Sequence, residues 1–251
     1  MKFNVKNCKV IHFGNNNVEN EYFMNGKKLE IVTEEKDLGV WTDKTMKPSK
    51  QCETAANTAN RILGQISRAF HYRKKSNLVP LYKTFVRPKL EYAVAAWNPW
   101  LGKDIAILER VQERLIKMIS NVKGESYEEK LTDAGLTTLK ERRERGDMIE
   151  TFKVMKGLCR ANKNEWFNIQ TYNDMTRATR TTTSVTEQGQ TRREDIIFRE
   201  HVRLETRKNF FCIRVTQNWN EIPDEIRNQK SINGFKNSYD KWIIQKKQAA
   251  K

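Results

Sequence analysis

Side chains that could perform catalysis are thinly scattered along this sequence. Two-metal nucleotidyl transfer needs closely placed carboxylates to hold both ions, and no Asp-Asp pair occurs in the chain. Adjacent glutamates occur at Glu34-Glu35 and Glu128-Glu129, in polar stretches that are typical of solvated charge. The histidines have no Ser or Cys partner at a recognisable spacing for a nucleophilic triad; they are His12, His71 and His201. The sequence therefore predicts no catalytic residue and no small-molecule substrate.

The cysteines do not form a metal-binding pattern. They lie far apart, with no C-x-x-C pair and no histidine spaced to complete a site; they are Cys8, Cys52, Cys159 and Cys212. We expect reduced and mostly buried thiols, no metal and no cofactor, because free cysteine usually behaves as a small hydrophobic residue. No apolar run reaches the roughly 20 residues that span a bilayer, so we expect an intracellular protein without a membrane partner.

Positive charge is the most informative property of the composition. The net formal charge is +16, which is typical of a protein whose partner is rich in phosphates. Most of this excess lies between Lys44 and Lys89, where eleven basic residues face a single acid, Glu53. Charge concentrated in this way indicates a docking surface rather than a general contribution to solubility.

The first part of the chain is expected to form β-structure. Cys8–Phe13 is rich in strand formers, and Leu38–Trp41 is a second candidate strand. Asn25-Gly26, between Tyr22–Met24 and Leu29–Val32, predicts a hairpin because a type I′ turn needs two residues with positive φ.

Helical periodicity begins after Pro48. The first predicted helix has an apolar stripe with helical spacing, formed by Ala55, Ala59, Ile62, Ile66 and Phe70. Further helices are predicted at Leu78–Phe85 and Leu90–Trp97 with a break near Pro88, then at Ile105–Ile119 and Leu139–Leu158.

The first of these helices also carries a stripe of cations. At 100° per residue, Lys50, Arg61 and Arg68 fall within about 20° of each other, with Asn57 and Gly64 beside them. Gly64 has no side chain and would allow a phosphate backbone to approach closely. Three more cations follow this helix: Arg73, Lys74 and Lys75. We interpret these residues as a nucleic-acid contact, and an ordinary solvated helix face is the alternative.

Two other groups of side chains are weaker candidates for nucleic-acid binding. Several aromatic residues could stack on bases, but their spacing with aliphatic neighbours favours the core; they are Tyr82, Phe85, Tyr92, Trp97 and Trp100. Arg110, Arg114 and Lys117 form a second basic face, which we expect to matter less because Glu109 and Glu113 would offset its charge.

The last third of the chain divides into a polar stretch and a helical end. Periodicity fails over 161–200, which predicts a flexible polar linker. Residues 201–251 are expected to form a small helical region, whose last helix has Ser231 as its N-cap and Phe235 and Tyr239 on one face.

Several segments resemble the LINE-type non-LTR retrotransposon reverse transcriptases. Cys8–Gly14 resembles the segment that follows the catalytic Asp-Asp box, and Lys36–Val40 with Asp43 resembles the primer-grip hairpin. Leu81–Tyr92, ending in Trp97-Asn98-Pro99, is similar to the thumb signature of the family. Further similar segments follow in the same order: Gly135–Leu139, Glu141–Arg143, Arg145–Met148, Arg214-Val215, Trp219-Asn220 and Ile222-Pro223.

The resemblance implies a mainly α fold with a small N-terminal antiparallel β portion, that is, an α+β protein. Leu38, Gly39 and Val40 would lie at the primer grip. The implied parts are a palm remnant with the primer-grip-like hairpin (1–43), a helical thumb with the following helices (44–160), the polar linker (161–200) and a C-terminal helical region (201–251).

The resemblance also implies a function. The chain would be the C-terminal part of an RNA-directed DNA polymerase, starting after the catalytic aspartates and unable to polymerise DNA alone. Its thumb would bind an RNA–DNA or DNA template–primer duplex beside the fingers and palm of the parent polymerase.

Mg²⁺ would belong only to that full-length enzyme, which would act in a nuclear and cytoplasmic ribonucleoprotein. Asn7 stands where relatives commonly carry a lysine, which fits a decayed copy or a fragment. Two alternatives remain: a stand-alone nucleic-acid-binding protein derived from a mobile element, and an inert product of a truncated element.

Overall fold

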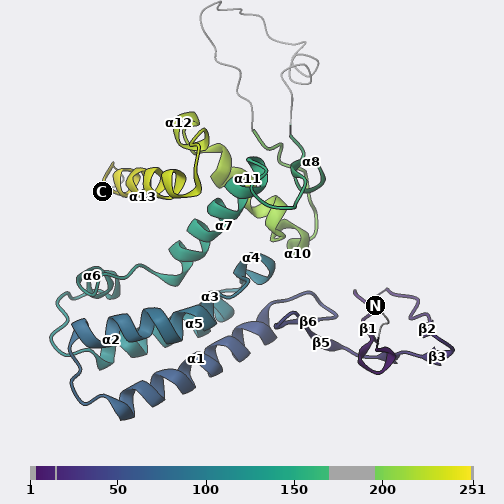
Figure 1. The fold of residues 1–251 in the computed structure, drawn as a ribbon, viewed down its shortest axis with the longest axis horizontal. Coiled ribbons are helices and arrows are strands. Elements are labelled where there is room, and N and C mark those ends of the chain that lie inside the picture. Colours follow the sequence, from purple (N-terminus) through teal and green to yellow (C-terminus); the bar gives the residue numbers. More distant parts are fainter. Residues whose placement is uncertain (1–3, 15, 170–195, 250–251) are drawn as a thin grey trace, which may run out of the picture. The chain divides into compact units, whose positions relative to one another are not determined.

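The computed structural model describes residues 4–14, 16–169 and 196–249 (Figure 1). The chain divides into two compact units, Met1–Arg143 and Glu144–Lys251. Within the described residues both units consist mainly of helices, and the named strands all lie before residue 44, which confirms the mainly helical α+β class. The predicted linker at 161–200 falls largely on residues 170–195, which lie outside the described part of the chain.

Three pairs of short strands form the β portion of the first unit. After the 3-10 helix η1 (Val5–Asn7), strand β1 (Lys9–Val10) pairs in parallel with β4 (Glu30–Ile31). The other two pairs are antiparallel hairpins: β2 (Phe23–Met24) with β3 (Lys27–Lys28), and β5 (Glu34–Asp37) with β6 (Val40–Asp43). The antiparallel prediction is therefore correct for the hairpins and wrong for β1 and β4, which are distant in sequence and run in the same direction.

The turns of both hairpins contain pairs of residues with positive φ. Asn25 and Gly26 have φ values of 51° and 72°, which confirms the predicted turn. Leu38 and Gly39 have φ values of 46° and 89°, so they form the turn between β5 and β6. The predicted strand at Leu38–Trp41 is wrong in its first half, because residues in the left-handed region cannot continue an extended strand.

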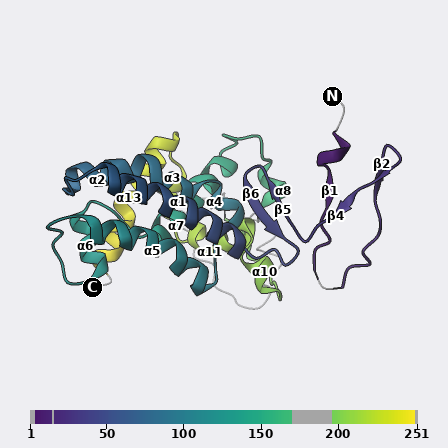
Figure 2. The same ribbon diagram turned by 90° about the horizontal axis from the view of Figure 1, so that it is seen from below.

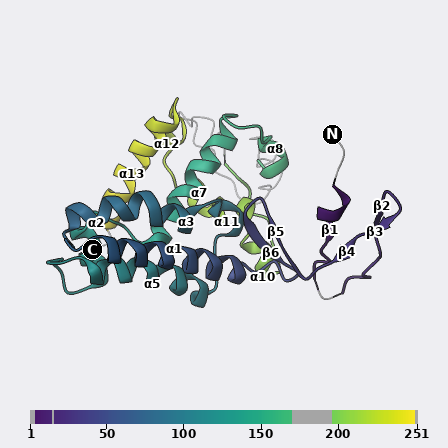
Figure 3. The ribbon, with the colours of Figure 1, turned by 60° about the horizontal axis from the view of Figure 1, so that its bottom comes forward.

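Helices α1 (Ser49–Ala69) and α5 (Gly102–Met118) form the framework of the first unit and lie side by side (Figures 1 and 3). Their facing sides are fully buried at Ala59, Leu63, Leu108 and Leu115, which makes this contact the centre of the core. The other helical elements of this unit are α2 (Lys75–Leu81), the π-helix η2 (Tyr82–Val86), α3 (Arg87–Glu91), α4 (Val94–Trp97), α6 (Tyr127–Asp133) and the beginning of α7 (Leu139–Met155).

The break expected near Pro88 is absent. Pro88 lies in the first turn of α3, and the helical path from α2 continues through the π turn of η2. The Arg87 N–H bonds to the Tyr82 carbonyl, five residues back. This wider turn changes the carbonyl positions before Pro88, where the proline ring would otherwise meet the carbonyl of the preceding turn. The chain instead changes direction at Ala93, whose φ is 50°.

The second unit is built around an aromatic cluster. Phe152 on α7 stacks on Phe235 of α13 (Ile232–Ala249), with ring centroids 4.4 Å apart, and Trp219 and Tyr239 also pack against Phe235. The Gly234 N–H donates to Ser231 Oγ over 3.0 Å, which confirms the predicted N-cap. The other described helices of this unit are α8 (Lys163–Trp166), α10 (Glu205–Lys208), α11 (Phe211–Asn220) and α12 (Asp224–Arg227).

Buried thiol and phenol groups make the fold sensitive to alkaline pH, and Cys52 and Tyr239 are two of them. Burial raises the pKa of the Cys52 thiol from 9.0 to about 12, and burial raises the pKa of Tyr239 from 10.0 to about 12. In the unfolded chain these groups release their protons at lower pH than in the folded protein. Their contribution to stability is therefore complete below about pH 9 and is lost as the pH rises toward 12.

The free energy of unfolding in urea is expected to fall between pH 8 and 11. Tyr239→Phe and Cys52→Ala should each make this dependence on pH less steep. An unchanged pH dependence in both variants would contradict the expectation.

Candidate nucleic-acid interface

Much of the predicted cationic stripe lies open to solvent on α1. Arg61 and Arg68 are exposed, and neither has an ion-pair or hydrogen-bond partner among the residues that the structure describes. Asn57 is also exposed. A Cβ built on Gly64 would meet no heavy atom within 4 Å, so this glycine leaves open space beside the two arginines. The structure thus brings these four residues together on one accessible face.

Lys50, at the start of α1, is placed differently. Its Nζ lies 3.1 Å from Glu34 Oε1 and 5.3 Å from the centroid of the Trp41 ring. The Trp41 N–H also donates to Gln51 Oε1 over 3.0 Å, which holds the β5–β6 hairpin against the first turn of α1. Lys50 therefore links this hairpin to the helix, and its charge is already compensated by an acid.

The three cations after α1 also differ from one another. Lys75 Nζ bonds to Asp133 Oδ1 over 3.0 Å, and this bond holds the pKa of that carboxyl below its usual range. A guanidinium nitrogen of Arg73 lies 3.5 Å from Ser67 Oγ, so this side chain folds back along the last turn of α1. Lys74 is exposed and has no partner among the described residues. Arg73 and Lys74 therefore add positive charge that is not paired with an acid among the described residues, whereas the charge of Lys75 is compensated by Asp133.

Helix α5 contributes cations to the same face. Ser49 Oγ donates to Asp104 Oδ2 over 2.7 Å near the start of both helices, and Arg114 lies 3.4 Å from Asn60 Oδ1 farther along. The two helices therefore run parallel. Arg110, Arg114 and Lys117 are exposed with the i, i+4, i+7 spacing of one helix face, and Arg114 places that face next to α1.

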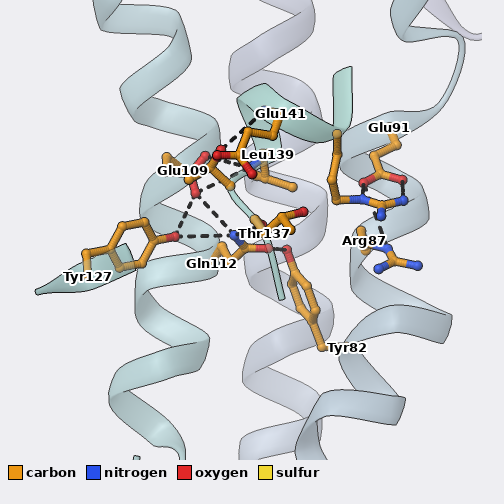
Figure 4. A network of polar contacts seen from close by, with 11 residues as sticks. Tyr82, Arg87, Glu91, Glu109, Gln112, Tyr127, Thr137, Leu139 and Glu141 are labelled. Carbon is orange, nitrogen blue, oxygen red and sulfur yellow. Dashed lines mark hydrogen bonds and ion pairs between the residues drawn. The ribbon is translucent and has the colours of Figure 1, made fainter. Parts of the chain in front are cut away.

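Of the two acids expected to offset the cations of α5, Glu109 belongs to a polar network inside the unit (Figure 4), whereas Glu113 lies half-buried on the same helix. The Glu109 carboxylate accepts the Tyr127 hydroxyl over 2.7 Å and the Leu139 N–H over 3.1 Å. Both contacts direct Glu109 away from the cations of α5. We call Arg61, Arg68, Arg110, Arg114 and Lys117 the basic face. The side-by-side arrangement of α1 and α5 that creates it is visible from below in Figure 2.

Two cations of the basic face also have a structural role that is independent of binding. Arg68 and Lys117 lie in the last turns of their helices. Cations in that position stabilise a helix by typically 0.3–1 kcal/mol through its dipole. Arg61, Arg110 and Arg114 lie before the last turns, so the dipole gives them no comparable role.

The hairpin with the primer-grip resemblance is anchored at its turn. The Tyr92 hydroxyl donates to the Leu38 carbonyl over 3.0 Å, and a Cβ on Gly39 would lie 3.3 Å from the Tyr92 ring. The Leu38 side chain is 85% exposed, whereas Val40 packs against the core. The hairpin therefore presents one apolar side chain at a fixed position.

The aromatic residues considered for stacking are divided between core and surface. Tyr82 and Trp97 are buried, as the sequence predicted, whereas Phe85 and Tyr92 are exposed. Phe70, predicted in the apolar stripe of α1, is 42% exposed because the helix ends at Ala69 and Phe70 is extended with a φ of −118°.

Comparisons with known proteins provide little functional information. No family model matches the chain, and no solved structure matches it. The chain is similar to an uncharacterized protein of Caenorhabditis elegans, with 26% identity over 119 residues. The matched part covers 46% of this chain and about 60% of the length of that relative.

The described residues contain neither a metal-binding cluster nor a membrane-spanning helix. Within 4–14, 16–169 and 196–249, no group of three His, Cys, Asp or Glu side chains is placed to hold a metal ion. No helix in the same residues is both long enough and apolar enough to cross a membrane.

Proposed function

We propose that this chain binds a template–primer duplex, either DNA or an RNA–DNA hybrid, through the basic face. In this proposal it is the thumb-containing part of a LINE-type reverse transcriptase, and the catalytic carboxylates belong to the parent polymerase. The observation that carries the proposal is the pairing of two parallel helices whose exposed cations form one accessible surface.

The spacing of the cations suits a phosphate backbone. Arg61 and Arg68 are seven residues apart, which corresponds to about 10.5 Å along a helix. Phosphates of one duplex strand advance by about 3.4 Å along the duplex axis, so the two arginines would span roughly three nucleotides. Arg110 and Lys117 have the same separation on α5 and would follow the duplex in the same way. Such contacts neutralise phosphates without reading base edges, so little sequence preference is expected.

The anchored hairpin supports the same proposal. A primer grip must hold the end of a strand in a constant position, and Leu38, Gly39 and Val40 are tied to α1 and Tyr92 by the contacts described above. Lys50 would support this hairpin rather than contact phosphate.

The dependence of affinity on salt tests the proposal. Arg61→Gln, Arg68→Gln and Arg114→Gln in one protein should lower the magnitude of the slope of log K against log[salt] by roughly 2–3 on a blunt DNA duplex, because each lost phosphate contact contributes about 0.9. Lys50→Gln alone should leave the slope nearly unchanged, because Glu34 already pairs with that ammonium group.

The matched control replaces three exposed arginines of the second unit: Arg160→Gln, Arg199→Gln and Arg203→Gln. It removes the same formal charge and should change the slope much less. Equal slopes in the two triple variants would show that only the total charge of the protein affects affinity. That result would contradict a specific contact between the basic face and the phosphates. Helical circular dichroism of both variants must match that of the wild type, because loss of helix in the first variant would mean that its cations are structural.

Gene context distinguishes a polymerase part from a stand-alone binding protein. An in-frame Tyr/Phe-Ala-Asp-Asp coding run upstream of the Met1 codon would support the polymerase. Stop codons there, with an expressed transcript, would support a separate protein that uses the same basic face.

A further inference from the structure

The loop between α1 and α2 exposes aromatic rings in a stretch of basic residues. Tyr72 is 77% exposed, Phe70 is 42% exposed, and His71 is also exposed. Single exposed apolar side chains are common on protein surfaces, but neighbouring exposed rings form a patch of the kind that marks an interaction surface. The loop directly follows the last turn of α1, which contains Arg68 of the basic face.

Backbone contacts hold this loop in place. The Phe70 N–H bonds to the Ile66 carbonyl over 3.0 Å, and the Ser120 N–H bonds to the Arg73 carbonyl over 2.8 Å. The first contact fixes the loop to the end of α1, and the second fixes it beside the end of α5. The aromatic rings are therefore carried at the C-terminal end of the helix pair that forms the basic face.

The electrostatic surroundings favour a nucleic acid over an apolar protein surface. Arg68 and Lys74 are exposed near the loop, and Arg73 folds back to Ser67 on α1. No Asp or Glu occurs in the sequence between Glu53 and Glu91. Asp133, which approaches from α6, is bound by Lys75. Exposed aromatic rings can stack on bases, and neighbouring uncompensated cations can bind the phosphates to which those bases are attached.

We propose that Tyr72, supported by Phe70, stacks on unpaired bases of a strand that continues past the duplex. The inference rests on the proposed function, because the basic face would place the duplex and the loop would receive the single-stranded nucleotides beyond it. The preferred ligand is then a junction between duplex and single strand. Stacking involves the faces of the bases and not the sugar 2′-hydroxyl, so DNA and RNA overhangs should bind alike.

Paired ligands test this inference with the full chain. One is a blunt DNA duplex, and the other is the same duplex with a single-stranded overhang of about six nucleotides, a length within the usual site size of such proteins. The wild type should bind the overhang ligand about 10-fold more tightly, which is the effect of one stacked base. Tyr72→Ala should abolish most of this preference without weakening binding to the blunt duplex, and Tyr72→Phe should keep it. Tyr22→Ala, at a half-exposed tyrosine of the β portion, is the matched control and should change neither affinity.

The outcomes separate the two proposals. Equal binding of both ligands by the wild type, or an equal loss on both ligands in Tyr72→Ala, would overturn the stacking role of the loop. An RNA overhang that binds much more tightly than the DNA overhang would contradict readout by stacking alone. If the triple arginine variant binds the blunt duplex like the wild type while Tyr72→Ala still removes the overhang preference, duplex binding by the basic face fails and the single-strand site stands.

Discussion

Replacing Gln112 by Leu is expected to lower the free energy of unfolding by about 3 kcal/mol. Gln112 is fully buried, and its Oε1 accepts the hydroxyl of the buried Tyr82 over 2.9 Å. Its Nε2 donates to the Thr137 carbonyl over 3.0 Å and to Glu109 Oε1 over 3.1 Å (Figure 4). Leucine fills a similar volume but offers no polar atom, so several groups lose a partner at once. An unsatisfied buried polar group costs about 1–3 kcal/mol.

A double-mutant cycle separates this cost from a simple change in packing. Tyr82→Phe alone should cost about 1–2 kcal/mol, because it leaves Gln112 Oε1 without its donor. Adding Tyr82→Phe to Gln112→Leu should cost much less than it does in the wild type, because the hydroxyl then has no partner to lose. Urea unfolding measures all four proteins. Additive effects, or a cost below about 1 kcal/mol for Gln112→Leu, would mean that the network does not hold the unit together.

Replacing Arg214 by Met should be the most damaging single change in the second unit, at about 3–5 kcal/mol. The Arg214 guanidinium donates to both carboxylate oxygens of Asp147 over 2.9 Å. The side chains of Arg214 and Asp147 are only 13% and 6% exposed. Methionine would withdraw this bidentate partner from a carboxylate that water barely reaches. Adding Asp147→Asn should recover part of the loss, because it removes the charge left behind.

The second unit contains a matched control at Arg145, which lies on α7 together with Asp147. Arg145 makes an equivalent bidentate pair with Asp240, but their side chains are 32% and 44% exposed. Arg145→Met should therefore cost less than about 1 kcal/mol, because water replaces the lost contact. Thermal and urea unfolding of Arg214→Met and Arg145→Met provide the comparison. Similar losses in the two variants would show that burial does not set the strength of these pairs.

Local signals predicted a large part of the fold. The apolar spacing after Pro48 gave α1, the spacing from Ile105 gave α5, and Asn25-Gly26 gave a hairpin turn because each signal acts within a few residues. The sequence pattern predicted the wrong element where the backbone conformation is rare for the residue type. Leu38 adopts a positive φ that leucine rarely takes, so its turn was read as a strand.

The candidate site was only partly predictable, because it depends on contacts between distant segments. A helical wheel correctly grouped Asn57, Arg61 and Arg68, which all belong to α1. The same wheel could not show that Lys50 would meet Glu34 on a hairpin, or that Arg114 would reach Asn60 on a parallel helix. The boundary between the two units was equally hidden, since it falls at Arg143 inside α7 and no change of periodicity marks it.

The π turn of η2 allows the chain to be one residue shorter at this point without a change in the surface that follows it. Such a turn accommodates one residue more than an α-helix of the same rise, like an insertion that the helix has absorbed. Deleting one residue here would restore an ordinary helix and leave the later residues on the faces they now occupy, because the Arg87 N–H would then meet the same Tyr82 carbonyl as an i→i−4 donor. Glu91, which accepts from Arg142 Nη2 over 3.0 Å, would therefore keep this contact. Homologous chains that are one residue shorter in this stretch would carry the same Arg-Pro-Lys-Leu-Glu residues on the same face.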